Sequence, residues 1–169
     1  MTVVEHSADD EALLERAMAL CSDAELDGES GEAVGEPTEC ALVNDANKAG
    51  MPKTKLKEEY PRIGEAPFDS MRKMMTTVHQ ASDGKIVQFS KGAPDEILKR
   101  CSKAWVSGAA VPLTEEMRQD ILEANKGMAD RPQSAVRFHA AVEKAPENFE
   151  PEFLEQDLIY VGLSGMIDP

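Results

Sequence analysis

The chain has 169 residues, of which 41% are hydrophobic, and this suits one soluble globular domain with a real core. Its formal net charge of −14 at pH 7 argues against nucleic acid or anionic lipid as a general partner, because both require basic surfaces. No apolar run approaches the length of about 18 residues that a transmembrane helix needs, and the first residues lack the pattern of a signal peptide. We therefore expect no direct membrane contact.

The three cysteines are odd in number and far apart, with no C-x-x-C spacing: Cys21, Cys40 and Cys101. This pattern predicts neither a disulfide framework nor structural zinc, and it fits a reducing cytosolic setting in which each thiol packs as a small hydrophobe. No spacing of His, Cys and Asp predicts a metal site, and we expect His6 and His79 on the surface.

The first third of the chain predicts helices. Ser7 and Asp10 resemble a helix N-cap, which favours a helix over 8–21. The acidic, glycine-rich segment 23–35 lacks periodicity and predicts a mobile loop. Two more helices follow, one from the cap Thr38 to Lys48, stopped by Gly50, and a short one over 53–59.

The middle of the chain predicts strands. Gly64 and Pro67 interrupt the strand pattern over 63–68, which favours an irregular or edge strand. Two further strands, 74–80 and 85–90, flank an Asp-Gly pair, which is a strong hairpin signal.

The last part of the chain predicts both helices and strands. The expected elements are a helix over 95–101, a hairpin of 104–106 with 110–111, a helix capped by Thr114 with an apolar face of Met117, Ile121, Ala124 and Met128, a strand over 136–142, a loop over 144–156 and a strand over 158–166. Together these predict an α+β fold, a mostly antiparallel twisted sheet flanked by helices.

The segment Ser90-Lys91-Gly92-Ala93-Pro94-Asp95 carries the clearest functional signal. Glycine lets the backbone approach a ligand closely, and proline suits the first turn of a helix. Helix N-termini attract anions, and lysine adds a mobile point charge suited to phosphate. A strand-to-helix turn with an incidental lysine is the alternative interpretation.

Two more segments, Gly35-Glu36-Pro37-Thr38-Glu39-Cys40-Ala41-Leu42 and Phe68-Asp69-Ser70-Met71-Arg72-Lys73-Met74-Met75, join this signal. With Lys91-Gly92-Ala93-Pro94 they resemble the signature segments of the nucleotide-binding domain of P-type cation-transporting ATPases, the calcium-pump branch especially. The first residues, Met1-Thr2-Val3-Val4, resemble the sequence after that family's phosphorylation loop. Residues 165–169 resemble its return hinge. The resemblance implies one nucleotide-binding domain over 1–169, excised from the cytoplasmic part of a membrane pump.

The resemblance implies a set of ATP contacts. Phe68 would stack on adenine, an arrangement that contributes roughly 1–3 kcal/mol for a base on an aromatic face; a core phenylalanine is the alternative. Lys91 would lie deep in the adenosine pocket, with the backbone of Gly92 and Ala93 close to the ligand. Met75 would pack beside adenine or simply fill the core.

Charged side chains complete the implied set. Arg72 and Lys73 would start a strand and point to opposite faces, so Lys73 would face the phosphates while Arg72 makes a structural or inter-domain salt bridge. Glu39, with Glu36 as second choice, would accept a hydrogen bond from the adenine amine and so favour ATP over GTP. Either could instead be a plain first-turn carboxylate. Arg137 would support the phosphates or close onto the next domain.

The sequence departs from the family pattern at two places. Ser70 stands where some relatives carry a phosphate-directed arginine, so one phosphate contact is lost or weakened. Phe138 and His139 replace aliphatic residues beside Arg137, and the alignment could slip toward Arg131.

The function implied is ATP binding, as Mg-ATP with the metal carried by the phosphates. The family's catalytic Asp-Lys-Thr-Gly-Thr is missing from the sequence, so we expect no catalytic residue here and no turnover by the isolated chain. The implied partners are the phosphorylation and actuator domains of the same pump, and we expect a monomer when isolated. The alternatives are an acidic protein-interaction module with a degenerate nucleotide pocket and a free-standing hydrolase.

Overall fold

The structure is a computed structural model that describes residues 2–124, 133–138 and 149–167. Its main sheet has eight strands in the order β4-β5-β6-β9-β10-β7-β8, with β1 also paired to β10; β2 and β3 form a separate pair. The strands are β1 (Thr2–Ala8), β2 (Glu25–Leu26), β3 (Ala33–Val34), β4 (Arg62–Asp69), β5 (Met74–Gln80), β6 (Ile86–Gly92), β7 (Cys101–Val106), β8 (Ala109–Pro112), β9 (Gln133–Phe138) and β10 (Leu158–Ile167). Among these, β10 and β7 pair in parallel and the other pairs are antiparallel.

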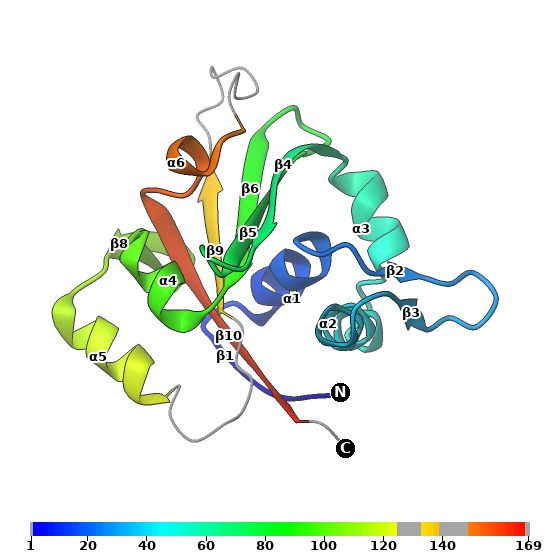
Figure 1. Cartoon of the computed structure of the whole chain (residues 1–169), viewed down its shortest axis with the longest axis horizontal. Helices are drawn as coiled ribbons and strands as arrows, with labels where there is room; N and C mark the ends of the chain where they lie inside the picture. The colour runs from blue at the N-terminus through cyan, green and yellow to red at the C-terminus, as the bar shows by residue number, and fades with distance from the viewer. Residues whose placement is uncertain (1, 125–132, 139–148, 168–169) are drawn as a thin grey trace.

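Helices cover both faces of this sheet (Figure 1). They are α1 (Glu11–Leu20), α2 (Pro37–Lys48), α3 (Lys53–Glu59), α4 (Pro94–Lys99), α5 (Glu115–Ala124) and α6 (Pro151–Leu154). Helix α1 packs on the sheet, and α2 and α3 pack in turn against α1; α4, α5 and α6 lie on the opposite side. The expected α+β class, with a mostly antiparallel sheet flanked by helices, is confirmed.

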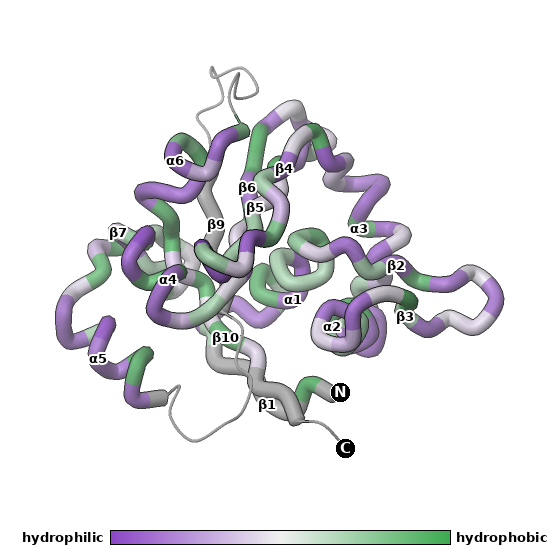
Figure 2. Tube along the Cα trace, viewed as in Figure 1, coloured by the Kyte–Doolittle hydropathy of each residue, from purple (hydrophilic) through white to green (hydrophobic). Residues whose placement is uncertain are grey.

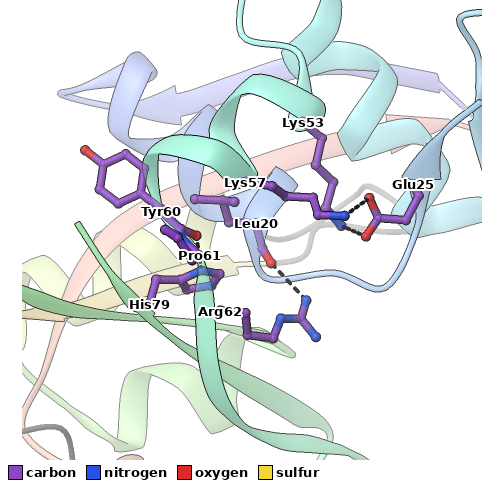
Figure 3. A pocket seen from close by; sticks show the side chains of 8 residues that line it. All are labelled: Leu20, Glu25, Lys53, Lys57, Tyr60, Pro61, Arg62 and His79. Carbon is purple, nitrogen blue, oxygen red and sulfur yellow. Dashed lines mark hydrogen bonds and ion pairs between the residues drawn. The ribbon is translucent and has the colours of Figure 1, made fainter. Parts of the chain in front are cut away.

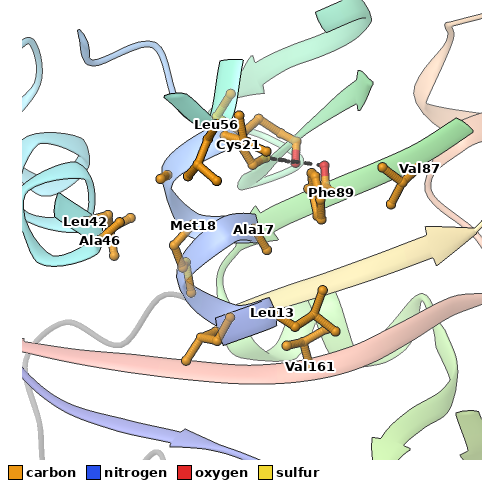
Figure 4. Close-up of a cluster of buried hydrophobic side chains, with 14 of the residues drawn as sticks. Leu13, Ala17, Met18, Cys21, Leu42, Ala46, Leu56, Val87, Phe89 and Val161 are labelled. Atoms are coloured by element: carbon orange, nitrogen blue, oxygen red, sulfur yellow. Dashed lines mark hydrogen bonds between the residues drawn. The ribbon is translucent and has the colours of Figure 1, made fainter. Parts of the chain in front are cut away.

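The larger core lies between α1 and the sheet (Figure 4). Leu13, Ala17 and Met18 of α1 are buried in one cluster with Phe89 and Val161 of the strands. Helix α1 is hydrophobic along most of its length, as a helix between two layers must be, whereas α5 is mostly hydrophilic (Figure 2).

Two smaller clusters fill the other face of the sheet. Met74 packs with Ile97 and Leu98 of α4, and Val78 packs with Leu154 of α6. Met75, the neighbour of Met74 in β5, belongs to the larger core beneath α1. Adjacent residues of this strand therefore point to opposite layers, as strand geometry requires.

The predicted start of the first helix was wrong. Residues 2–8 form β1, and the N-cap is Asp10, whose side chain accepts a hydrogen bond from the Leu13 N–H at 3.0 Å. Strand β1 pairs with β10, and Thr2 lies opposite Ile167. The partner is distant in sequence, so local patterning gave no sign of this strand.

Other expected boundaries shift by a few residues. Glu36, not Thr38, is the N-cap of α2, with Pro37 at the first helical position and a bond from the Glu39 N–H. The segment 23–35 contains the short pair β2–β3, while its mobility stays a prediction. The expected loop over 144–156 contains helix α6.

The predicted hairpins and the third helix are confirmed. Helix α3 spans Lys53–Glu59 as expected, and β4 is an edge strand whose pairing with β5 has two irregularities. Gly84 in the β5–β6 turn has φ +85°, which explains the glycine in the Asp-Gly signal. Thr114 caps α5 through the Met117 N–H. Met128 and residues 139–142 lie outside the described residues.

Within the described part, none of the helices combines the length and apolar composition needed to cross a membrane.

Candidate functional site

The β5–β6 hairpin determines where Lys91 points. Met75 lies opposite Lys91, Thr77 opposite Phe89 and His79 opposite Val87. Cross-strand neighbours share a face, and Met75, Phe89 and Val87 belong to the core beneath α1. Lys91 therefore lies at the edge of that core, on the layer that also contains α2. Met75 is buried in the core cluster, so its side chain fills the core; contact with a ligand stays a prediction.

Glu39 in the first turn of α2 is the partner of Lys91. The Lys91 Nζ lies 3.0 Å from Glu39 Oε2, and the two side chains are only 9% and 15% exposed. The Asp23 N–H donates to the same oxygen at 3.1 Å. Among the described residues both bonds fall on Oε2, which leaves Oε1 available for a further donor.

Glu36 has a local role in the structure. Its Oε2 accepts the Glu39 N–H at 3.1 Å, so it caps the helix that carries Glu39. This contact supports Glu39 over Glu36 as the carboxylate that faces a ligand, because the Glu36 side chain is occupied with its own helix.

Phe68 lies near the end of β4, and Lys73 lies in the turn that connects β4 to β5. Phe68 is 62% exposed, and the neighbouring Met71 is 90% exposed. Lys73 is exposed and has φ +60°, the left-handed region, rather than the extended backbone expected for a strand start. The strand begins at Met74, as predicted, and Arg72 and Lys73 precede it in a turn, so the expectation that these two side chains follow the alternation of a pleated strand was wrong.

Asp69 builds this turn. Its Oδ1 accepts the backbone N–H of Met71 at 2.7 Å and of Arg72 at 3.3 Å, which is a typical turn-forming use of aspartate. Because these N–H groups stabilise the ionised form, they hold the pKa of Asp69 below its usual value.

The Arg72 side chain is mostly buried and connects the turn to Glu155. Its Nε lies 2.5 Å from Glu155 Oε1, and its Nη2 donates to the Pro67 carbonyl at 2.9 Å. Glu155, whose side chain is completely buried, also accepts the Thr76 hydroxyl at 2.7 Å. The structural salt bridge expected for Arg72 is therefore present, and Lys73 remains the exposed cation of the pair.

Gly92 and Ala93 pack against the same turn. A Cβ on Gly92 would lie 2.5 Å from the Lys73 carbonyl oxygen and 2.5 Å from Met74 Cβ, and the Ala93 N–H donates to the Lys73 carbonyl at 3.1 Å. The missing side chain thus lets the segment after Lys91 touch the turn that follows Phe68 and carries Lys73. The close approach is to the chain itself; approach to a ligand stays a prediction.

Arg137 lies on β9, where it pairs with Gln88 of β6. Its side chain, the alternative Arg131 and the neighbouring His139 lie outside the part of the chain that the structure describes. The structure thus connects Glu39 to Lys91 directly, and connects the turn that follows Phe68 and carries Lys73 to Gly92.

One residue that supports this region, His79, was predicted wrongly from the sequence. His79 is buried, not on the surface as predicted: its Nδ1 lies 2.8 Å from the Tyr60 carbonyl and its Nε2 lies 2.8 Å from Thr77 Oγ1. Burial lowers its pKa to about 4. Strand alternation could have revealed this, because His79 shares the face of Met75.

Among the described residues no group of His, Cys, Asp and Glu is arranged to hold a metal ion.

Comparison with known proteins identifies the class. Residues 11–169 match the family described as "P-type ATPase, cytoplasmic domain N", and the chain belongs to this family. It is 37% identical over 163 residues to calcium-transporting ATPase 1 of Lactococcus lactis and 40% identical over 161 residues to that of Bacillus cereus, in each case over 95% of this chain. It is also 30% identical over 176 residues to the sodium/potassium-transporting ATPase subunit alpha-2 of Gallus gallus, over 94% of this chain. The chain spans 17–18% of the length of these relatives, so it corresponds to one domain of them.

Proposed function

We propose that this chain is the ATP-binding domain of a cation-transporting P-type ATPase, which holds adenosine and delivers the γ-phosphate to an aspartate in a separate phosphorylation domain. The observation that carries the proposal is the mostly buried Lys91–Glu39 pair, whose lysine directly precedes Gly92, the residue that packs against the turn after Phe68. Family membership supports it, because the relatives are named as transporting ATPases.

Adenine would stack on Phe68. A phenylalanine that is 62% exposed contributes little to a core, and an aromatic face is a general platform for a purine. Glu39 Oε1 would accept the exocyclic amine of adenine, while Oε2 stays with Lys91 and the Asp23 amide. Guanine carries a carbonyl at that place and would face a carboxylate without a donor, so ATP would bind better than GTP.

The phosphates would extend toward Lys73 and Arg137. Lys73, on its left-handed turn, is free of strand pairing and can reach toward an anion, and Arg137 would add a second positive charge. Mg²⁺ would arrive on the triphosphate. Positioning is what the domain contributes; the metal and the aspartate of the other domain would perform the phosphoryl transfer.

The pairing of β1 with β10 supports the proposed place of this domain in a longer pump. Thr2 lies opposite Ile167, so the chain can enter and leave through adjacent strands, as a domain inserted into another one requires. We propose residues 165–169 as the return hinge and the phosphorylation and actuator domains as the partners.

Titration of the ¹⁵N-labelled domain with Mg-ATP tests the proposal. We expect binding with a Kd between about 0.1 and 1 mM, which corresponds to roughly −4 to −5.5 kcal/mol, with amide shifts concentrated at residues 68–75 and 91–93. Phe68→Ala should weaken binding about tenfold or more. The control Phe153→Ala removes an exposed phenylalanine on α6 and should have no effect. No shifts at these segments at saturating ATP would overturn the proposal and favour a protein-interaction module. Phosphate release in a single-turnover assay would favour a hydrolase.

A further inference from the structure

Lys53 is a buried lysine on the first turn of α3, and it is not one of the predicted ATP contacts. It is 1% exposed, and its Nζ lies 2.9 Å from the Ser22 carbonyl, 3.1 Å from Ser22 Oγ and 2.5 Å from the Ala24 carbonyl. Glu25 lies 3.6 Å away. The ammonium has three donors, and the loop after α1 supplies three acceptors. Burial lowers its pKa, and the Glu25 carboxylate opposes this shift.

Arg62 of β4 holds the same loop from the other side. Its Nη2 donates to the Ser22 carbonyl at 2.6 Å, and its Nη1 pairs with Asp23 at 3.0 Å. Both cations line a cavity of about 320 Å³, shown in Figure 3. Their donors are already used by the loop and by neighbouring carboxylates. The two cations therefore hold residues 22–24 in place, and the cavity wall is poorly suited to bind an anion.

The loop 22–24 contacts the candidate site. The thiol of Cys21 donates to the Phe89 carbonyl at 3.3 Å, and burial raises its pKa to about 11, so it stays a neutral donor. Two residues on, the Asp23 N–H donates to Glu39 Oε2 at 3.1 Å. A backbone amide fixed by its neighbours is a rigid donor, whereas the Lys91 ammonium can rotate. The loop therefore fixes the orientation of the Glu39 carboxylate, with one oxygen engaged and the other left for a further donor.

We infer that Lys53 is a positioning residue for adenine recognition: it fixes the loop 22–24 so that the Asp23 amide holds Glu39 with Oε1 turned to the purine amine. The inference rests on the proposed function. It deepens that function by assigning base selectivity to a lysine that touches no ligand.

The test compares ATP and GTP affinities of the domain with those of Lys53→Met and Lys53→Arg. Lys57→Met is the matched control, because Lys57 lies one turn further along α3, pairs with the same Glu25 and is 53% exposed. We expect Lys53→Met to weaken ATP binding about three- to tenfold with little change for GTP, so that the preference for ATP shrinks. Lys53→Arg should recover part of the preference, and Lys57→Met should leave it unchanged.

A double variant separates positioning from general damage. If Lys53 acts through Glu39, adding Lys53→Met to Glu39→Ala should cause no further loss of ATP preference. Should Lys53→Met fail to fold, Ser22→Ala, which removes one acceptor of the ammonium, should reduce the preference in the same direction by about twofold.

Each remaining outcome decides the matter. An unchanged ratio of the two affinities in a folded variant, or an equal loss for both nucleotides, overturns the role of Lys53 while ATP binding stands. Equal affinities of the unmodified domain for ATP and GTP remove the role of Glu39 and that of Lys53 together. Absence of ATP binding to the unmodified domain is the separate failure of the proposed function.

Discussion

The ammonium of Lys91 lies 3.0 Å from Oε2 of Glu39 and joins the end of strand β6 to the first turn of helix α2. Both side chains are largely shielded from water, so each charge depends on the other for compensation. A pair in this position serves the fold when no ligand is present, and it sets the charge of the site before a nucleotide arrives.

Removal of either partner should therefore destabilise the domain. We expect Lys91→Met to lower the free energy of unfolding by about 1–3 kcal/mol, because the Glu39 carboxylate is left mostly buried with one backbone donor. The double variant Lys91→Met/Glu39→Gln should recover part of this loss, since it removes the uncompensated charge. Urea unfolding monitored by circular dichroism measures the free energy of unfolding of the unmodified domain and of both variants.

An exposed ion pair provides the control for these variants. Lys99 lies 3.3 Å from Glu96 on α4 and is two-thirds exposed. Lys99→Met should change the free energy of unfolding by less than about 0.5 kcal/mol. A similar small effect for Lys91→Met would show that the Lys91–Glu39 pair contributes nothing special to the fold.

Gly92 should tolerate no side chain. A Cβ there would lie 2.5 Å from Lys73 O, a backbone atom that cannot move aside without distorting the turn. Gly92→Ala should cost about 1–3 kcal/mol of stability and shift the amide resonances of the β4–β5 turn. In contrast, Gly28→Ala places its Cβ in open space and should be nearly neutral. Equal stability of the two variants would contradict the contact.

The local elements were predictable because their signals are local. The Asp-Gly turn predicted the β5–β6 hairpin, and helix α3 lies where its polar and apolar residues predicted it. Strand β1 was missed because its support comes from β10, at the other end of the chain, and local patterning cannot report such a partner. The cap of α2 was misassigned because Glu36, a less common capping residue, precedes the more usual Thr38.

The residues of the site also separate into those that the sequence predicts and those that it does not. Motif resemblance selected Glu39 and Lys91, which the structure brings into contact. It could not select Lys53 and Arg62, because they hold a neighbouring loop that is distant from them in sequence, mainly through its backbone carbonyls. A carbonyl acceptor has no side-chain identity, so the sequence gives little indication of these contacts. The burial of His79 was readable from strand alternation, and the preference of histidine for surfaces obscured it.

The buried carboxylate of Glu155 should make Arg72 important for stability. Arg72→Met leaves Glu155 with the Thr76 hydroxyl as its described partner, in a site without water access. We expect a loss of about 3 kcal/mol in the free energy of unfolding, with part of it recovered in Arg72→Met/Glu155→Gln. The exposed pair Lys85–Asp83 is the control, and Lys85→Met should be nearly neutral. A neutral Arg72→Met would contradict the anchoring role.

His79 should make the domain sensitive to acid. Burial is the main reason that its pKa falls to about 4 from the usual value near 6.5, and the neighbouring cations Arg62 and Lys53 lower it further. Both folded and unfolded chains hold a neutral imidazole above pH 6.5, so its contribution is complete there. Between pH 6.5 and about 4 the unfolded chain takes up a proton that the folded chain refuses, and stability falls as the pH falls.

Replacement of His79 by glutamine isolates this contribution. Glutamine offers hydrogen-bonding groups toward the Tyr60 carbonyl and the Thr77 hydroxyl but does not titrate. The difference in unfolding free energy between the unmodified domain and His79→Gln should be constant above pH 7. It should then shift in favour of the variant by up to about 3 kcal/mol on descent to pH 4. Urea unfolding at half-unit pH intervals measures the two curves, and carboxylate titration cancels in their difference. Parallel curves across this range would mean that His79 binds its proton equally well in the folded and unfolded chains, which is incompatible with an imidazole buried beside two cations.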